Sequence, residues 1–168
     1  MSLSMYTASV PQFAHVLRAM LGWLDKAEAH AKARGFDANN YLGLRLAPDM
    51  LPFSRQIQIA SDTVKGAAAR LAGQEPPAWE DTEATLEELR VRIRRTIDFV
   101  EGFGAAQIDG SDERPIAIPT RTGEPRRFTG EAYLKTFVLP NLYFHATTTY
   151  ALLRHAGVEL GKKDFLAL

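Results

Sequence analysis

Three polar side chains stand out between Pro140 and Gly157, where the spacing of apolar residues predicts a long helix. Asn141 and His145 are four residues apart, so they project from successive turns in the same direction and could contact one ion or one small molecule. Thr148 extends this polar line by one more turn. A carboxamide, an imidazole and a hydroxyl together offer hydrogen-bond donors and acceptors, and the imidazole is also a ligand for transition metals.

A second predicted helix could complete this site from across the core. Gln56 falls on or beside its apolar stripe, whereas Gln58 and Asp62 are expected to point outward. Asp49 could add a carboxylate or could cap the helix start after Pro48. The candidate ligand-binding residues are Asp49, Gln56, Asn141, His145 and Thr148. The alternative is a buried polar set that is satisfied by backbone groups or water.

Four apolar stripes with helical spacing predict the helices that position these side chains. The stripes run from about Val10 to Ala31, Met50 to Leu71, Thr82 to Phe103 and Gly130 to Ala156. The third segment carries four arginines, which we expect to form a solvated face paired with neighbouring glutamates. These are Arg90, Arg92, Arg94 and Arg95. Pro140 lies inside the fourth helix, where it should kink the axis.

The fourth helix is apolar on two faces, which indicates that something covers it on both sides. Opposite its core-facing stripe lie Leu139, Tyr143, Ala146 and Tyr150. The connection 104–129 is long enough to hold a β-hairpin, with Ile116 and Ile118 on one strand, residues 126–128 on the other and a glycine turn between them. We expect this connection to cover the outer face, and a homodimer through the same face is the alternative.

Composition limits the possible partners and the compartment. With 168 residues, 46% of them hydrophobic, the chain is expected to form a single domain over residues 1–168. Lysines plus arginines equal aspartates plus glutamates at 20 each, so no overall charge favours nucleic acid or an anionic membrane. The chain has no cysteine, which excludes disulfides and thiolate metal sites and fits a reducing, cytoplasmic environment. No apolar run approaches the roughly 18 residues of a membrane span.

Two segments resemble the DinB/YfiT-like superfamily, in particular an uncharacterised bacterial branch of it: FVLPNLYFHATTTYALLRHAGVELGKKDFL and RLAPDMLPFSRQIQIASD. The resemblance covers nearly the whole chain and implies an all-α, up-down-down-up four-helix bundle. Several better-known members are metal-dependent hydrolases or thiol S-transferases, whose metal binds a histidine of the second helix and a His-x-x-x-His pair on the last. His145 matches the second histidine of that pair. Asn141 stands at the first position, and the second helix, 48–72, has no histidine.

This pattern leaves His145 as the one candidate ligand for a divalent metal such as zinc or nickel, and it predicts no firmly held cofactor. Three hypotheses for function follow. The first is a bundle with a polar pocket that binds a small molecule. The second is a divergent metal-dependent hydrolase or thiol S-transferase, and the third is a structural or interaction module that uses the apolar outer face of the fourth helix. No nucleophile motif or pair of inward carboxylates identifies a catalytic residue.

Overall fold

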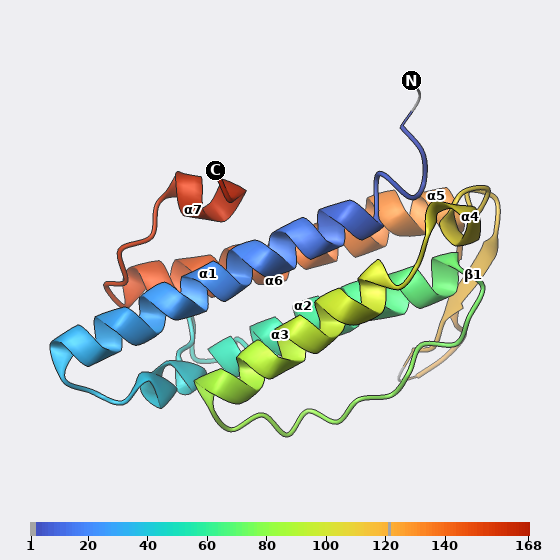
Figure 1. The fold of residues 1–168 in the computed structure, drawn as a ribbon. Coiled ribbons are helices and arrows are strands. Elements are labelled where there is room, and N and C mark those ends of the chain that lie inside the picture. Colours follow the sequence, from blue (N-terminus) through green and yellow to red (C-terminus); the bar gives the residue numbers. More distant parts are fainter. Residues whose placement is uncertain (1–2, 121) are drawn as a thin grey trace.

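The computed structural model describes residues 3–120 and 122–168. Four long helices lie side by side (Figure 1): α1 (Val10–Arg34), α2 (Phe53–Leu71), α3 (Leu86–Glu101) and α6 (Leu139–His155). The shorter helices are η1 (Ala38–Gly43), α4 (Ala105–Ile108), α5 (Gly130–Ala132) and α7 (Lys162–Leu166). A π-helical turn, η2 (Tyr133–Val138), precedes α6, and β1 (Pro115–Ile118) pairs with β2 (Arg126–Thr129). In the described part of the chain, no helix has both the length and the apolarity needed to cross a membrane.

The direction of each long helix can be followed by colour in Figure 1. Helices α1 and α6 run one way, and α2 and α3 run the other. Ion pairs confirm that α1 and α3 are antiparallel, because Arg18 pairs with Glu101 near one end and Glu28 pairs with Arg90 near the other. The bundle therefore has the predicted up-down-down-up connectivity. Since α2 and α3 are parallel, the segment 72–85 must run back along the bundle to join them (Figure 1).

Capping explains where α3 begins. The hydroxyl of Thr85 accepts a hydrogen bond from the Glu88 amide at 3.1 Å, and the Glu88 carboxylate accepts one from the Thr85 amide at 3.0 Å. This capping box satisfies amides that the first helical turn leaves unpaired. The Ala84 amide also donates to Glu88, and this bond is the main cause of the lowered pKa of the carboxyl. The predicted start at Thr82 is thus wrong by one turn, because 82–84 belong to the extended connection.

The fourth helical segment is interrupted by η2, which ends at Val138, two residues before Pro140. In a regular α-helix the proline ring would meet the carbonyl of Thr136, and the proline nitrogen could not donate to it. The wider π turn accommodates both effects. The irregularity expected at Pro140 therefore takes the form of a π turn. At the start of this segment Gly130 lies against the Ser111 carbonyl so closely that a Cβ would be only 1.9 Å from its oxygen.

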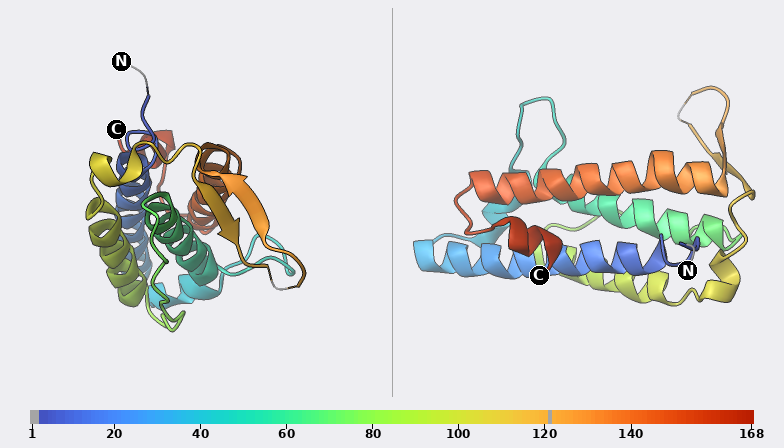
Figure 2. Two further views of the ribbon diagram at one scale, coloured as in Figure 1. Left: turned by 90° about the vertical axis from the view of Figure 1, so that its right-hand side faces the viewer. Right: turned by 90° about the horizontal axis from the view of Figure 1, so that it is seen from above.

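The predicted hairpin is present, but it does not cover the outer face of α6. Phe128 packs against Tyr133 and Phe137 instead, with ring centroids 5.9 and 5.8 Å apart. Tyr150, on the outer face, meets Trp23 of α1 edge-on at 5.7 Å and Phe165 of α7 at 5.6 Å. The expectation that 104–129 covers this face is wrong at Tyr143 and Tyr150, because α1 and α7 lie there, as Figure 2 shows. Leu139, at the start of the same face, does border the connection, in a hollow that Asp109, Gly110 and Asp112 also line. A homodimer stays a prediction.

Candidate functional site

His145 and Gln56 face one another across the α2–α6 contact. The imidazole Nδ1 lies 2.7 Å from the Gln56 Oε1, and both side chains are buried. The Gln56 side-chain amide also donates from Nε2 to the Leu51 carbonyl at 2.8 Å, in the loop before α2. One glutamine therefore joins the middle of α6 to the segment that precedes α2.

These two bonds determine the tautomer of His145. The Leu51 carbonyl can only accept, so Gln56 must present its nitrogen to Leu51 and its oxygen to His145. The oxygen can only accept, and Nδ1 therefore carries the proton in the neutral ring. Burial lowers the pKa of His145, which favours that neutral ring at neutral pH. The lone pair of Nε2 is left without a hydrogen bond among the described residues, and Nε2 is not sealed from solvent.

Asn141 and Thr148 flank His145 on α6, but they are engaged differently. The Asn141 amide nitrogen donates to the hydroxyl of Thr63 on α2 at 2.7 Å, and the residue is half-buried. Thr148 is buried, and its hydroxyl donates back to the Phe144 carbonyl one turn earlier at 2.8 Å. Asn141 thus shares the α2–α6 surface with His145, whereas the hydroxyl hydrogen of Thr148 is used within the helix.

Asp49 does not join this group. It is exposed in the loop between η1 and α2, and it makes no hydrogen bond or ion pair with the other four candidates. It does not cap α2 either, because that helix begins at Phe53 with Pro52 at the capping position. The apolar stripe that suggested an earlier start continues into Met50, which lies in the loop.

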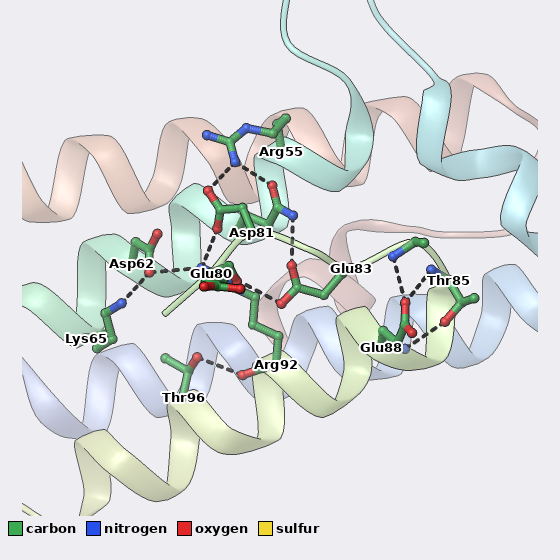
Figure 3. A network of polar contacts seen from close by, with 12 residues as sticks. Arg55, Asp62, Lys65, Glu80, Asp81, Glu83, Thr85, Glu88, Arg92 and Thr96 are labelled. Atoms are coloured by element: carbon green, nitrogen blue, oxygen red, sulfur yellow. Dashed lines mark hydrogen bonds and ion pairs between the residues drawn. The ribbon is translucent and has the colours of Figure 1, made fainter. Parts of the chain in front are cut away.

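Sequence reasoning missed a polar network on the other side of α2. Arg92, expected in solvent, is buried beneath the segment 72–85, and its guanidinium meets three carboxylates (Figure 3). Nη1 donates to Glu83 at 2.9 Å, and Nη2 lies 3.0 Å from Asp62 and 2.8 Å from Asp81. The Nη2 contacts are ion pairs by distance and lack the alignment of hydrogen bonds. Burial alone would lower the pKa of Arg92, but Glu83 and the neighbouring carboxylates raise it overall.

Two further expectations fail in the same region. Gln58, expected to point outward, is buried and donates to Glu83 at 2.8 Å. Arg90 is buried too, among Asp25, Glu28 and Glu87. Helical spacing could have predicted the burial of both arginines, because each is three or four residues from apolar positions of the α3 stripe and so lies at its inner edge.

Comparison with known proteins identifies the family of this fold. The family model described as "Domain of unknown function (DUF1993)" matches residues 5–166. The chain belongs to the DUF1993 family. A crystal structure of a DinB family member protein from Shewanella denitrificans is 42% identical, with a TM-score of 0.86 over 96% of this chain and 90% of that one. No curated protein matches. This DUF1993 chain therefore represents a DinB-like branch, as the sequence predicts.

The side chains of this DUF1993 protein do not fit the three-histidine metal site that the resemblance implies. Gln56 stands across from His145 on α2, and its oxygen already accepts from the imidazole. Asn141 donates to Thr63, and carboxamides are poor ligands for zinc or nickel. Among residues 3–120 and 122–168 no group of three or more His, Cys, Asp or Glu side chains is arranged to hold a metal ion. The donors present suit hydrogen bonding to a ligand better than metal coordination.

Proposed function

We propose that this DUF1993 protein binds a small uncharged molecule at the α2–α6 surface, through the imidazole of His145. The observation that carries the proposal is the bond from His145 Nδ1 to Gln56. It directs Nε2, an acceptor with no hydrogen-bond partner among the described residues, away from α2. An imidazole held in one tautomer by a second residue is a prepared binding group rather than a passive part of the core.

The surroundings of His145 indicate the chemistry of the ligand. Nε2 can accept a hydrogen bond from an O–H, N–H or S–H group. Phe144 is 57% exposed and its ring stands edge-on to the imidazole, with centroids 5.2 Å apart. Leu51, whose carbonyl anchors Gln56, is also exposed, in the loop that protrudes beside α6 (Figure 2). These features favour a molecule that joins one donor group to an apolar part.

Asn141 supplies a second polar contact one turn from His145. Its Nδ2 donates to Thr63, and its Oδ1 makes no hydrogen bond within residues 3–120 and 122–168, so that this oxygen can accept from a ligand. Five hollows of about 100 to 550 Å³ on the described surface are lined by residues other than Asn141, Phe144 and His145, and we place the ligand on the exposed surface of α6 beside these three side chains. Asn141 and His145 therefore form the polar part of the proposed site, with Phe144 as its apolar part.

The proposal can be tested with a matched pair of probes and a matched pair of variants. Phenol carries a donor beside an apolar ring, and anisole has the same ring without the donor. We expect phenol to shift the imidazole nitrogen resonances of His145 saturably in a long-range ¹H–¹⁵N NMR spectrum. Since one hydrogen bond contributes about 1 kcal/mol, anisole should bind about fivefold more weakly.

In the variants, binding is followed by the side-chain amide signals of Asn141. His145→Ala should lose the difference in affinity between phenol and anisole, and His155→Gln, which removes an exposed histidine of the same helix, should keep it. If phenol and anisole shift the wild-type resonances equally, or not at all, the proposal is wrong. His145 and Gln56 would then be a satisfied polar pair of the core. A metal-dependent hydrolase or transferase is the less favoured function, because the donor set around His145 does not fit a metal.

A further inference from the structure

Two arginines that have no acidic partner in the described part of the chain line one hollow at the far end of α2. Arg70 lies in the last turn of α2 and Arg114 directly before β1, and both border a hollow of about 380 Å³. Among the described residues, neither guanidinium has a carboxylate within ion-pair distance. The hollow is remote from His145, because Arg70 is 14 residues beyond Gln56, about 21 Å along the helix at the standard rise.

Each guanidinium is held in place by one hydrogen bond and rests over a glycine. Arg70 Nη1 donates to the hydroxyl of buried Tyr133 at 3.2 Å, and a Cβ on Gly66 would lie 2.6 Å from that nitrogen. Arg114 donates to the Leu71 carbonyl at the end of α2, and a Cβ on Gly73 would lie 3.2 Å from its guanidinium. The two glycines thus leave room for both planar groups to lie close to the backbone.

These contacts use only part of the donor capacity of each arginine. A guanidinium has five N–H donors, and each of these two makes one hydrogen bond within the described residues. None of the remaining nitrogens of Arg70 or Arg114 is sealed from solvent. Two positive forks with free donors therefore face one hollow, and the planar fork matches the two oxygens of a carboxylate or phosphate.

We propose that this hollow binds a small organic oxyanion, whose carboxylate or phosphate group bridges Arg70 and Arg114. Pro115, Ala117 and Pro119 of the hairpin provide apolar wall for the rest of the molecule. Among the described residues that line the hollow, Glu75 is the one carboxylate, and it is not paired with either arginine. A bound oxyanion would supply the negative charge that the protein itself does not bring to these two arginines.

Titration with two probes tests whether the hollow binds an oxyanion and whether it prefers a carboxylate or a phosphate. Benzoate has a carboxylate on an apolar ring, whereas inorganic phosphate has no apolar group. At low ionic strength we expect saturable shifts of the Arg70 and Arg114 Nε–H signals in ¹H–¹⁵N NMR spectra. Tighter binding of benzoate would identify a carboxylate ligand with an apolar body, and tighter binding of phosphate would identify a phosphate ligand.

Variants distinguish specific binding of the anion in this hollow from nonspecific attraction of the anion to positive charge. Arg70→Gln and Arg114→Gln should each weaken binding about tenfold or more, since each removes a charged hydrogen-bonding fork. Arg127→Gln removes the same charge from an exposed position on the same hairpin, outside the lining, and should change binding by less than about twofold. If Arg114→Gln fails to fold, Arg114→Lys replaces it, because this variant keeps the positive charge and removes the planar guanidinium. The proposal is overturned if neither probe binds saturably, or if Arg127→Gln weakens binding as much as the two lining variants do.

Discussion

Buried arginines on α3 and half-buried arginines at the hairpin end of α2 show two uses of the same side chain. Arg90 and Arg92 each contact three carboxylates, and their charge is neutralised inside the protein. Arg70 and Arg114 contact a hydroxyl and a carbonyl, and their charge is left for solvent or a ligand. The formal net charge of the chain is zero, but among the described residues positive charge is neutralised at α3 and is not neutralised by carboxylates at the end of α2. The difference indicates that the α3 arginines stabilise the fold, whereas the α2 end has charge available for binding.

The largest loss of stability is expected when Arg92 is replaced. Arg92→Gln removes the partner of three carboxylates and should lower the free energy of unfolding by about 3 kcal/mol, because the remaining acids repel one another beside the bundle. Urea unfolding followed by circular dichroism measures the change. The matched control is Arg94→Gln, on the exposed side of α3, which should cost less than about 1 kcal/mol. Equal costs at both positions would show that the buried contacts of Arg92 stabilise the fold no more than an exposed arginine does.

A smaller loss of stability is expected at Arg70. Arg70→Gln removes one hydrogen bond to the buried hydroxyl of Tyr133 and leaves no carboxylate unpaired, so unfolding should become easier by about 1 kcal/mol. The same urea experiment measures this. A cost as large as that of Arg92→Gln would mean that Arg70 is a structural residue, and the contrast between the two regions would not hold.

The smallest effect concerns the α2–α6 site, where the polar group is neutral. Because burial lowers the pKa of His145, the unfolded state binds a proton at a higher pH than the folded state does. The stability from neutral His145 is fully present above its ordinary pKa of about 6.5 and is lost as the pH falls through the lower, folded-state value. Between about pH 8 and about pH 5 the free energy of unfolding should decline less steeply in His145→Gln than in the wild type. An equal decline in both proteins, with His155→Gln as the control, would show that His145 is not the titrating group.

The sequence predicted the parts of this protein that depend on regular spacing. Apolar stripes located all four long helices, and the alternation around Ile116 located the hairpin. The placement of His145 and Gln56 toward one another also follows from helical periodicity. The helix start at Leu86 was missed, although Thr85 and Glu88 have the residue types and spacing of a capping box.

The features that the sequence did not predict depend on connecting segments, in which apolar residues have no regular spacing. Arg92 is buried because the extended connection carries Asp81 and Glu83 back across α2 and α3, and no helical pattern predicts that path (Figure 3). Asp49 could not be placed for a similar reason, since Pro48 and Pro52 allow either an early helix start or a loop. The closure of the α6 outer face by Phe165 depends on the turn after His155, which sends α7 back over α1.

The parallel arrangement of α1 and α6 has a consequence for the order in which the protein can fold during its synthesis. Trp23 on α1 meets Tyr150 and Phe165, which are translated more than a hundred residues later. Until that part of the chain has left the ribosome, one side of α1 has no native partner, although α3 can already pack against the other. Contacts of such long sequence separation form slowly, because a long loop must close before they add stability. The nascent chain therefore presents an uncovered tryptophan on its first helix, and this is a surface that a chaperone can bind before α6 and α7 are made.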